Sequence, residues 1–410
     1  MSPQARLLLT SRGLRAFGDG FIALTLPVYL IGLGLSAFQV GLIVTATLLG
    51  SAALTLVVGL AAHRIAARTL LSFASLLMLA TGLAFSEARA FWPLLVVGFV
   101  GTLNPSGGDV SPFLPLEQSL LAHAGPDAQR TSLYAAYGLT GSLALAAGSL
   151  VLAAAHWAGV RFGIAPLDVV RALFVLYGLI GLLVLALYRR LPAQEGDAEA
   201  ARQPLGQSRN RVLMLAGLFS IDAFGGGFVV QSLLALWLLQ HWGLSIPAAS
   251  AFFFWAGLLA AFSQVAAGWL ARRIGLVNTM VFTHIPANLS LMAVPLAPNL
   301  TVAMSLLLVR FALSSMDVPA RTSYVMAVVT PPERAAAASL TNVPRGLAAA
   351  LSPSLAGLLF AASPFAWPLM IGGGLKISYD LLLLAMFRAV KPPEEQAANN
   401  RRMSASGSPT

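Results

Sequence analysis

Apolar stretches of about 20 residues, separated by short turns, follow one another along the whole chain. A helix needs about 20 apolar residues to cross the hydrocarbon core of a bilayer. Of the 410 residues, 58% are hydrophobic and 10% are charged, and the mean hydropathy is +0.80. Soluble domains carry about a quarter charged residues. We therefore expect an all-α polytopic membrane protein, and the number of stretches excludes single-span and surface-bound proteins.

Twelve such windows lie between clusters of glycine, proline and charged residues. Each is long enough to span a bilayer, and no charged loop of more than about 25 residues interrupts the series. We expect transmembrane helices at 13–34, 39–61, 69–86, 91–110, 132–156, 167–188, 212–240, 248–271, 277–296, 299–318, 335–361 and 366–387.

The basic residues alternate with these windows. Nineteen of the 25 lysines and arginines lie in the N-terminal segment, the even-numbered connections or the C-terminal tail, and three (Arg89, Arg161 and Arg171) lie on the opposite side. Cytoplasmic loops are rich in lysine and arginine. We therefore expect both termini and the 189–211 loop in the cytoplasm. The net charge of +10 is explained by the bilayer, so we expect no nucleic-acid partner.

Several classes of chemistry lack their residues. The chain has no cysteine, which excludes disulfides, iron–sulfur clusters, thiolate zinc sites and a cysteine nucleophile. Phosphate-binding and dinucleotide-binding glycine loops and a serine hydrolase triad are also missing. We expect no enzyme, cofactor or metal site. The five histidines, none of which forms an i, i+4 pair, are His63, His123, His156, His241 and His284.

The two halves of the chain repeat each other. Ala16-Phe-Gly-Asp-Gly-Phe recurs as Ala223-Phe-Gly-Gly-Gly-Phe, and Gly34-Leu-Ser as Gly243-Leu-Ser. Two further landmarks recur at the same offset of 207 to 209 residues. Repeats of this kind are typical of transporters. We expect a bundle of six helices in 1–188, a cytoplasmic linker in 189–211, a second bundle of six helices in 212–390 and a disordered tail in 391–410.

On these features the chain resembles the major facilitator superfamily of secondary transporters. The resemblance also rests on the loops after the second and eighth spans and on a Pro-Glu-Arg segment. The family's loop motif places an acidic residue where this chain has a histidine or an arginine, so we expect Asp109 or Asp317 to supply the missing charge contact. The residues implied by the resemblance as cytoplasmic gate or loop motif are Gly59, His63, Arg64, Arg68, Asp109, Gly268, Arg272, Arg273, Asp317, Glu333, Arg334 and Arg345.

Ionisable groups at membrane depth are the candidates for transport chemistry, since each costs about 2.5–3.5 kcal/mol at the centre of a spanning helix. Asp19 and Asp222 are our candidates for proton coupling, because a desolvated carboxylate takes up and releases protons. The alternative for Asp19 is a fixed pair with Arg15, four residues earlier. Lys376 and Asp380 fit a lipid-side or interhelix pair.

Arg310 requires an anion, because a guanidinium does not lose its charge. Asp317, a carboxylate on another span, or the substrate could provide it. The other cavity candidates offer few hydrogen-bonding groups for a sugar, which favours a small organic solute. They are Phe17, Asn104, Tyr137, Phe224 and Gln231.

We expect a monomeric, proton-coupled secondary transporter that works by alternating access. Its partners are then a small solute, protons and membrane lipid, and we favour export over uptake. The arginine-rich, alanine-rich composition suggests the inner membrane of a bacterium. A membrane sensor or lipid-handling protein that kept the fold and lost transport is the alternative.

The expected topology is tested by labelling. A cysteine at Ser404 should resist an impermeant maleimide added to intact cells and react once the membrane is permeabilised. A cysteine at Ser363, in an expected external loop, should react in intact cells. Labelling of Ser404→Cys from outside would show that the orientation is wrong.

Overall fold

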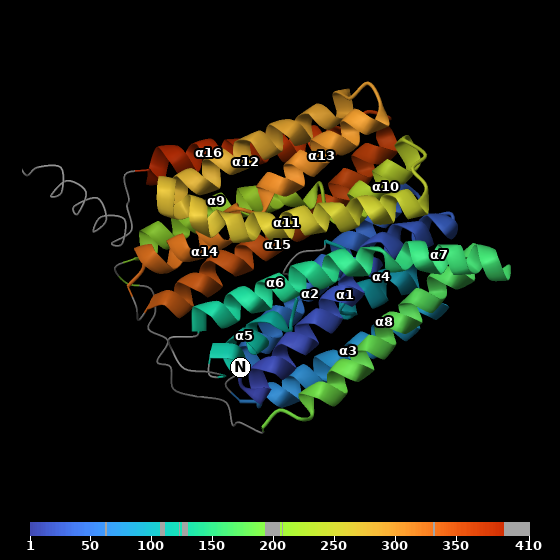
Figure 1. The fold of residues 1–410 in the computed structure, drawn as a ribbon, viewed down its shortest axis with the longest axis horizontal. Helices are drawn as coiled ribbons and strands as arrows, with labels where there is room; N and C mark the ends of the chain where they lie inside the picture. The colour runs from blue at the N-terminus through green and yellow to red at the C-terminus, as the bar shows by residue number, and fades with distance from the viewer. Residues whose placement is uncertain are drawn as a thin grey trace, which may run out of the picture.

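The structure is a computed structural model that describes residues 1–61, 64–106, 111–122, 124, 130–192, 206, 208–330 and 333–388. All regular structure in this part of the chain is helical (Figure 1). The first half contains α1 (Pro3–Gly32), α2 (Ala37–Ala61), α3 (Ala67–Glu87), α4 (Phe91–Val100), α5 (Leu114–Ala122), α6 (Arg130–Ser149), α7 (Val151–Phe162) and α8 (Pro166–Tyr188). The second half contains α9 (Arg209–Gly227), α10 (Gln231–His241), α11 (Ile246–Ile274), α12 (Leu276–Ala293), the 3₁₀ turn η2 (Val294–Leu296), α13 (Leu300–Ser314), α14 (Asp317–Val328), α15 (Arg334–Ala362) and α16 (Trp367–Phe387).

Eleven of the twelve expected spans are helical segments long and apolar enough to cross a membrane. The all-helical, multi-pass prediction is therefore confirmed. The fourth span differs from the prediction, because α4 ends at Val100 and a non-helical segment precedes α5. Gly101 has an extended backbone, and Pro105 follows it. Both residues disfavour continuation of the helix, which explains why the expected 91–110 helix is wrong over the described residues 101–106.

The repeated Gly-Leu-Ser motif forms the same turn in both halves. Gly34 and Gly243 have backbone φ angles of +80° and +60°, a region that favours glycine. The serine two residues later begins the next helix. Ser245 Oγ accepts a hydrogen bond from the Ala248 amide, and Ser36 Oγ accepts one from the Gln39 amide. The motif is thus a helix stop followed by an N-cap.

The helix packing also repeats. In the first half α1 packs on α6 and α8, α3 on α8, and α2 on α4. In the second half α9 packs on α15 and α16, α12 on α16, and α11 on α13. These are the same pairs of spans in each half. Figure 1 shows the first half, blue to green, below the second half, yellow to red.

The two halves meet through α2 with α15 and through α6 and α7 with α11. Gly41 and Gly357 bring two helix backbones together, since a Cβ on either residue would lie 3.0 Å from the Cα of the other. The Ser354 amide donates to Thr45 Oγ1 at 2.9 Å across the same contact. We call the end of the bundle where α1 begins and α16 ends the terminal end. The Gly41–Gly357 contact lies toward the opposite, far end.

Candidate functional site

A carboxylate in the first half gathers three partners from three helices. Glu117 on α5 is fully buried and forms an ion pair with Arg15 on α1. Tyr137 on α6 and Tyr188 on α8 both donate hydroxyl hydrogen bonds to it. The Arg15 guanidinium also lies over the Phe113 ring, 4.3 Å from its centre. We call Arg15, Phe113, Glu117, Tyr137 and Tyr188 the Glu117 cluster. Its ion pair and hydrogen bonds stabilise the buried negative charge of Glu117, because a buried charge without partners is costly.

Sequence reasoning missed Glu117, because the fourth span was expected to end at residue 110. The structure resumes the helix at Leu114, which carries Glu117 into the protein interior. A second apolar helix pattern after the Asn104-Pro105 break was the available signal. Arg15 accordingly contacts Glu117, while Asp19, one turn further along α1, acts on Arg15 through its charge.

The second half contains a larger group of buried charges around Asp222 on α9. Lys376 Nζ on α16 lies 2.6 Å from one Asp222 oxygen, and Arg321 Nη1 on α14 lies 3.3 Å from the other. Arg321 Nη1 also contacts Asp317 at 2.9 Å. We expected Arg321 in a cytoplasmic loop; that assignment is wrong, because α14 continues the tenth span and buries the side chain.

His284 on α12 links this group to a second carboxylate. Its Nδ1 lies 3.0 and 3.1 Å from the two oxygens of Asp380, and its Nε2 lies 3.9 Å from Asp222. Both Lys376 and Asp380 are buried, so they do not form the lipid-side pair that was one of the expected alternatives. Instead each contacts a different helix. We call Asp222, His284, Asp317, Arg321, Lys376 and Asp380 together the Asp222 cluster.

The two clusters are related by the repeat, with the signs of charge exchanged. Asp222 precedes the repeated Ala223-Phe-Gly motif at the position that Arg15 occupies before Ala16-Phe-Gly. Arg15 reaches an acid on α5, and Asp222 reaches a base on α14. Helices α5 and α14 are the second segments of the interrupted fourth and tenth spans. In each half, a buried ion pair therefore joins the first span to the second segment of the interrupted span.

Arg310 on α13 contacts neither cluster directly. Its residue is 9% exposed, and its guanidinium carbon lies 5.2 Å from the centre of the neighbouring Phe311 ring. Asp317, one of its expected partners, is paired with Arg321. Arg345 on α15 is half-buried and, like Arg310, lies within electrostatic range of Asp222.

The remaining cavity candidates fall into two groups. Asn104 Oδ1 accepts hydrogen bonds from the Ser106 amide and hydroxyl at 3.3 and 2.7 Å, so it organises the break after α4. Tyr137 belongs to the Glu117 cluster. The other three are half-buried on α1, α9 and α10; they are Phe17, Phe224 and Gln231.

Several described residues of the loop motif lie toward the terminal end, at the ends of α2 and α11 and the start of α3. Arg68 donates to the Leu191 carbonyl, Arg273 lies over the Trp269 ring, and Arg64 and Arg272 are exposed. Gly59 has open space around it, and a Cβ on Gly268 would lie 3.9 Å from Arg272 Nη1. His63 and Asp109 lie outside the described residues, as does the side chain of Arg334.

Glu333 ties the end of the linker to the start of α15. Its carboxylate accepts hydrogen bonds from the backbone amides of Gly206 at 2.8 Å and Ser208 at 3.1 Å. Hydrogen bonds from Ser208 and Gly206 hold the pKa of the Glu333 carboxyl below its usual range. This contact is fully formed at neutral pH and is lost as the pH falls through the lowered pKa.

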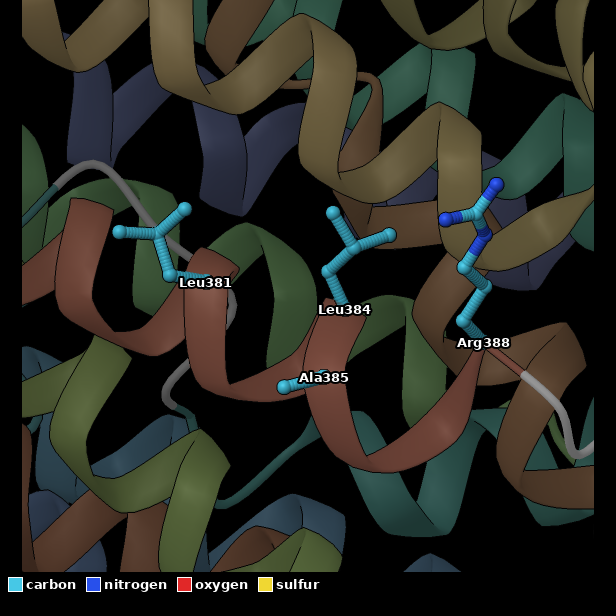
Figure 2. Close-up of a pocket in the computed structure, with 4 residues that line it drawn as sticks. All are labelled: Leu381, Leu384, Ala385 and Arg388. Atoms are coloured by element: carbon cyan, nitrogen blue, oxygen red, sulfur yellow. The ribbon is translucent and has the colours of Figure 1, made fainter.

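A surface hollow lies away from both clusters. It measures about 620 Å³ and is lined by Leu381, Leu384, Ala385 and Arg388 (Figure 2). Leu381 is 54% exposed, whereas Asp380 beside it in sequence is fully buried. The hollow therefore lies on the face of α16 opposite to the charges, where two leucines and an alanine provide most of its lining and Arg388 provides the rest.

Comparison with known proteins supplies the family. The model described as Major Facilitator Superfamily matches residues 8–316 and 224–408. The Uncharacterized membrane protein YJR124C of Saccharomyces cerevisiae is 25% identical over 426 residues, covering 95% of each chain. Among solved structures, the nucleoside transporter NupG has a TM-score of 0.72 at 13% identity, covering 94% of this chain and 99% of its own. A D-xylose-proton symporter has a TM-score of 0.73 at 17% identity, covering 92% and 96%.

The Glu117 cluster predicts a large and non-additive effect on stability. Glu117→Ala strands the buried Arg15 charge and should lower the free energy of unfolding by about 3–5 kcal/mol. Arg15→Met combined with Glu117→Leu removes both charges and should recover most of that loss. Thermal unfolding of the purified variants in one detergent measures the difference.

Glu87→Ala is the matched control, because Glu87 is 78% exposed and pairs with Arg171 at 3.1 Å. An exposed pair contributes about 1 kcal/mol or less. Equal destabilisation by Glu117→Ala and Glu87→Ala would contradict the importance of the buried cluster.

Proposed function

We propose that this chain, which belongs to the Major Facilitator Superfamily of membrane transporters, exports a small organic solute by alternating access and couples that movement to protons. Family membership rests on the family match, which covers most of the chain in two overlapping parts. It makes the chain a multi-pass membrane transporter and not an enzyme. The solute, the coupling ion and the direction are our proposals.

The main support for proton coupling is the Asp222 carboxylate, which has several basic side chains around it. Asp222 holds Lys376 and Arg321 at the same time, and His284 lies just beyond them. Such a carboxylate remains ionised while both cations are in place. If a rearrangement of the two halves withdraws one of them, the buried carboxylate becomes a proton acceptor, because an unpaired charge at membrane depth is costly.

Asp19 is the second coupling candidate. It is 7% exposed on α1 and lies one turn beyond Arg15, whose charge is taken by Glu117. Asp19 is thus a buried carboxylate at membrane depth, and we propose that it takes up and releases a proton during the transport cycle.

Three other features support the membrane orientation, the solute class and the proton coupling that we propose. The basic residues concentrate at the terminal end of the bundle, which is the expected cytoplasmic side. The half-buried candidates Phe17, Phe224 and Gln231 suit an organic solute with a large apolar part. One structural neighbour is named a proton symporter, although at 17% identity this likeness shows only the shared fold.

Neutral amides at the two candidate acids test the coupling. In proteoliposomes with an imposed pH gradient, Asp19→Asn or Asp222→Asn should abolish solute accumulation and leave exchange at equilibrium measurable, since the amide keeps the shape and loses the proton. A panel of organic solutes is screened first with wild-type vesicles, and an entrapped pH dye reports proton movement.

Asp168→Asn is the control, because Asp168 is 59% exposed on α8 and pairs with Arg171 at its surface. It should accumulate solute like the wild type. Full accumulation by both single variants and by the double variant would reject these acids as coupling groups. Absence of flux for wild-type protein over the whole panel would favour a membrane sensor without transport.

A further inference from the structure

Arg310 differs from the buried Arg15 and Arg321 in having no acidic contact. Arg15 pairs with Glu117, and Arg321 pairs with Asp222 and Asp317. No carboxylate among the described residues lies within 4.0 Å of the Arg310 guanidinium, although 91% of the residue is shielded from solvent. Its Nε is also buried without a hydrogen-bond partner.

The nearby acids are already occupied. Asp222 is the acid that acts on Arg310 electrostatically, yet Lys376 and Arg321 hold its two oxygens. Asp317, on the next helix segment, contacts Arg321. The negative charge of Asp222 therefore acts on Arg310 from a distance. No carboxylate of the described residues accepts a hydrogen bond from the Arg310 guanidinium.

The chemistry of the side chain then defines the missing partner. A guanidinium keeps its charge at any physiological pH and presents a planar fork of donors. Carboxylate and phosphate groups match this fork with two parallel hydrogen bonds. A neutral solute would leave the charge unpaired inside the membrane, which is unfavourable.

The surroundings of Arg310 suit an apolar body next to that anionic group. Phe311 flanks the guanidinium and is half-buried. The rings of Phe252 and Phe253 on α11 lie 6.3 and 6.5 Å from the Phe311 ring in edge-to-face geometry. Aromatic side chains beside one charged group are typical of sites for small organic ligands.

We propose that Arg310 binds a carboxylate or phosphate group of the transported solute, which is therefore an amphipathic organic anion. This inference rests on the proposed transport function and adds the chemical class of the solute. It assigns Arg310 a direct contact, while the Asp222 cluster next to it remains an internal network.

The test measures binding without any gradient, so that it does not depend on coupling. Purified protein in detergent is heated with benzoate, octanoate and phenyl phosphate, and with the uncharged benzamide, octanamide and phenol. We expect at least one anion to raise the unfolding temperature of the wild type more than its uncharged counterpart does. Arg310→Ala and Arg310→Met should weaken that binding by about thirtyfold or more, and Arg310→Lys should not restore it.

Stability without ligand separates binding from a structural role. Arg310→Met removes an arginine with no acidic contact and should not lower the unfolding temperature of the ligand-free protein. Arg321→Met, the matched variant, removes the partner of two buried acids and should lower it clearly. A ligand-free loss for Arg310→Met as large as that for Arg321→Met would show that Arg310 has a fixed partner in the protein.

Three further results would overturn the proposal. The first is a wild-type protein that prefers none of the anions, and the second is an anion effect that persists in Arg310→Met. The third is loss of bound phosphatidylglycerol in Arg310→Met, seen by native mass spectrometry, which would assign the anion to lipid. Gradient-driven flux of an uncharged solute would reject the anion contact at Arg310 and support the proposed transport function. Arg310-dependent anion binding without any flux would support the anion contact and reject the transport function.

Discussion

The cost of an unpaired charge inside a membrane governs the arrangement of this protein. Each half places a buried ion pair between its first span and the second segment of its interrupted fourth span, as Arg15 does with Glu117 and Asp222 with Arg321. Because the signs are exchanged between the halves, neither pair can be replaced by its repeat equivalent. The two tyrosine hydroxyls on Glu117 and the Phe113 ring under Arg15 complete the surroundings of one of these pairs, as buried charges require.

The interface between the halves is of a different kind. Close backbone contact at Gly41 and Gly357 and the hydrogen bond from the Ser354 amide to Thr45 join α2 to α15 without buried charge. Small residues let two helix backbones approach closely and pack by shape. The charges lie within the halves, so the halves are suited to move as units about this interface while their own networks stay closed.

Sequence analysis predicted the spans and the internal repeat, because apolar length and repeated turn motifs are local signals. The Gly34-Leu-Ser motif, for example, is a turn and a helix cap in one. Sequence analysis did not identify the partners of the buried charges. Glu117 lay beyond an interrupted helix, His284 was considered only as a metal ligand, and Lys376 reaches Asp222 on a helix 154 positions away in sequence. Such pairings depend on which helices meet, and no local pattern records that.

The central claim, that the two halves move against each other as units, is tested by distances between spin labels. Cysteines at Leu60 and Trp269 place labels on α2 and α11 at the terminal end, and cysteines at Val160 and Leu296 place them on opposite halves at the far end; all four positions are exposed. In lipid nanodiscs, acidification with a transported solute should change the two distances in opposite directions. Two distances that stay constant, or that change in the same direction, would contradict alternating access.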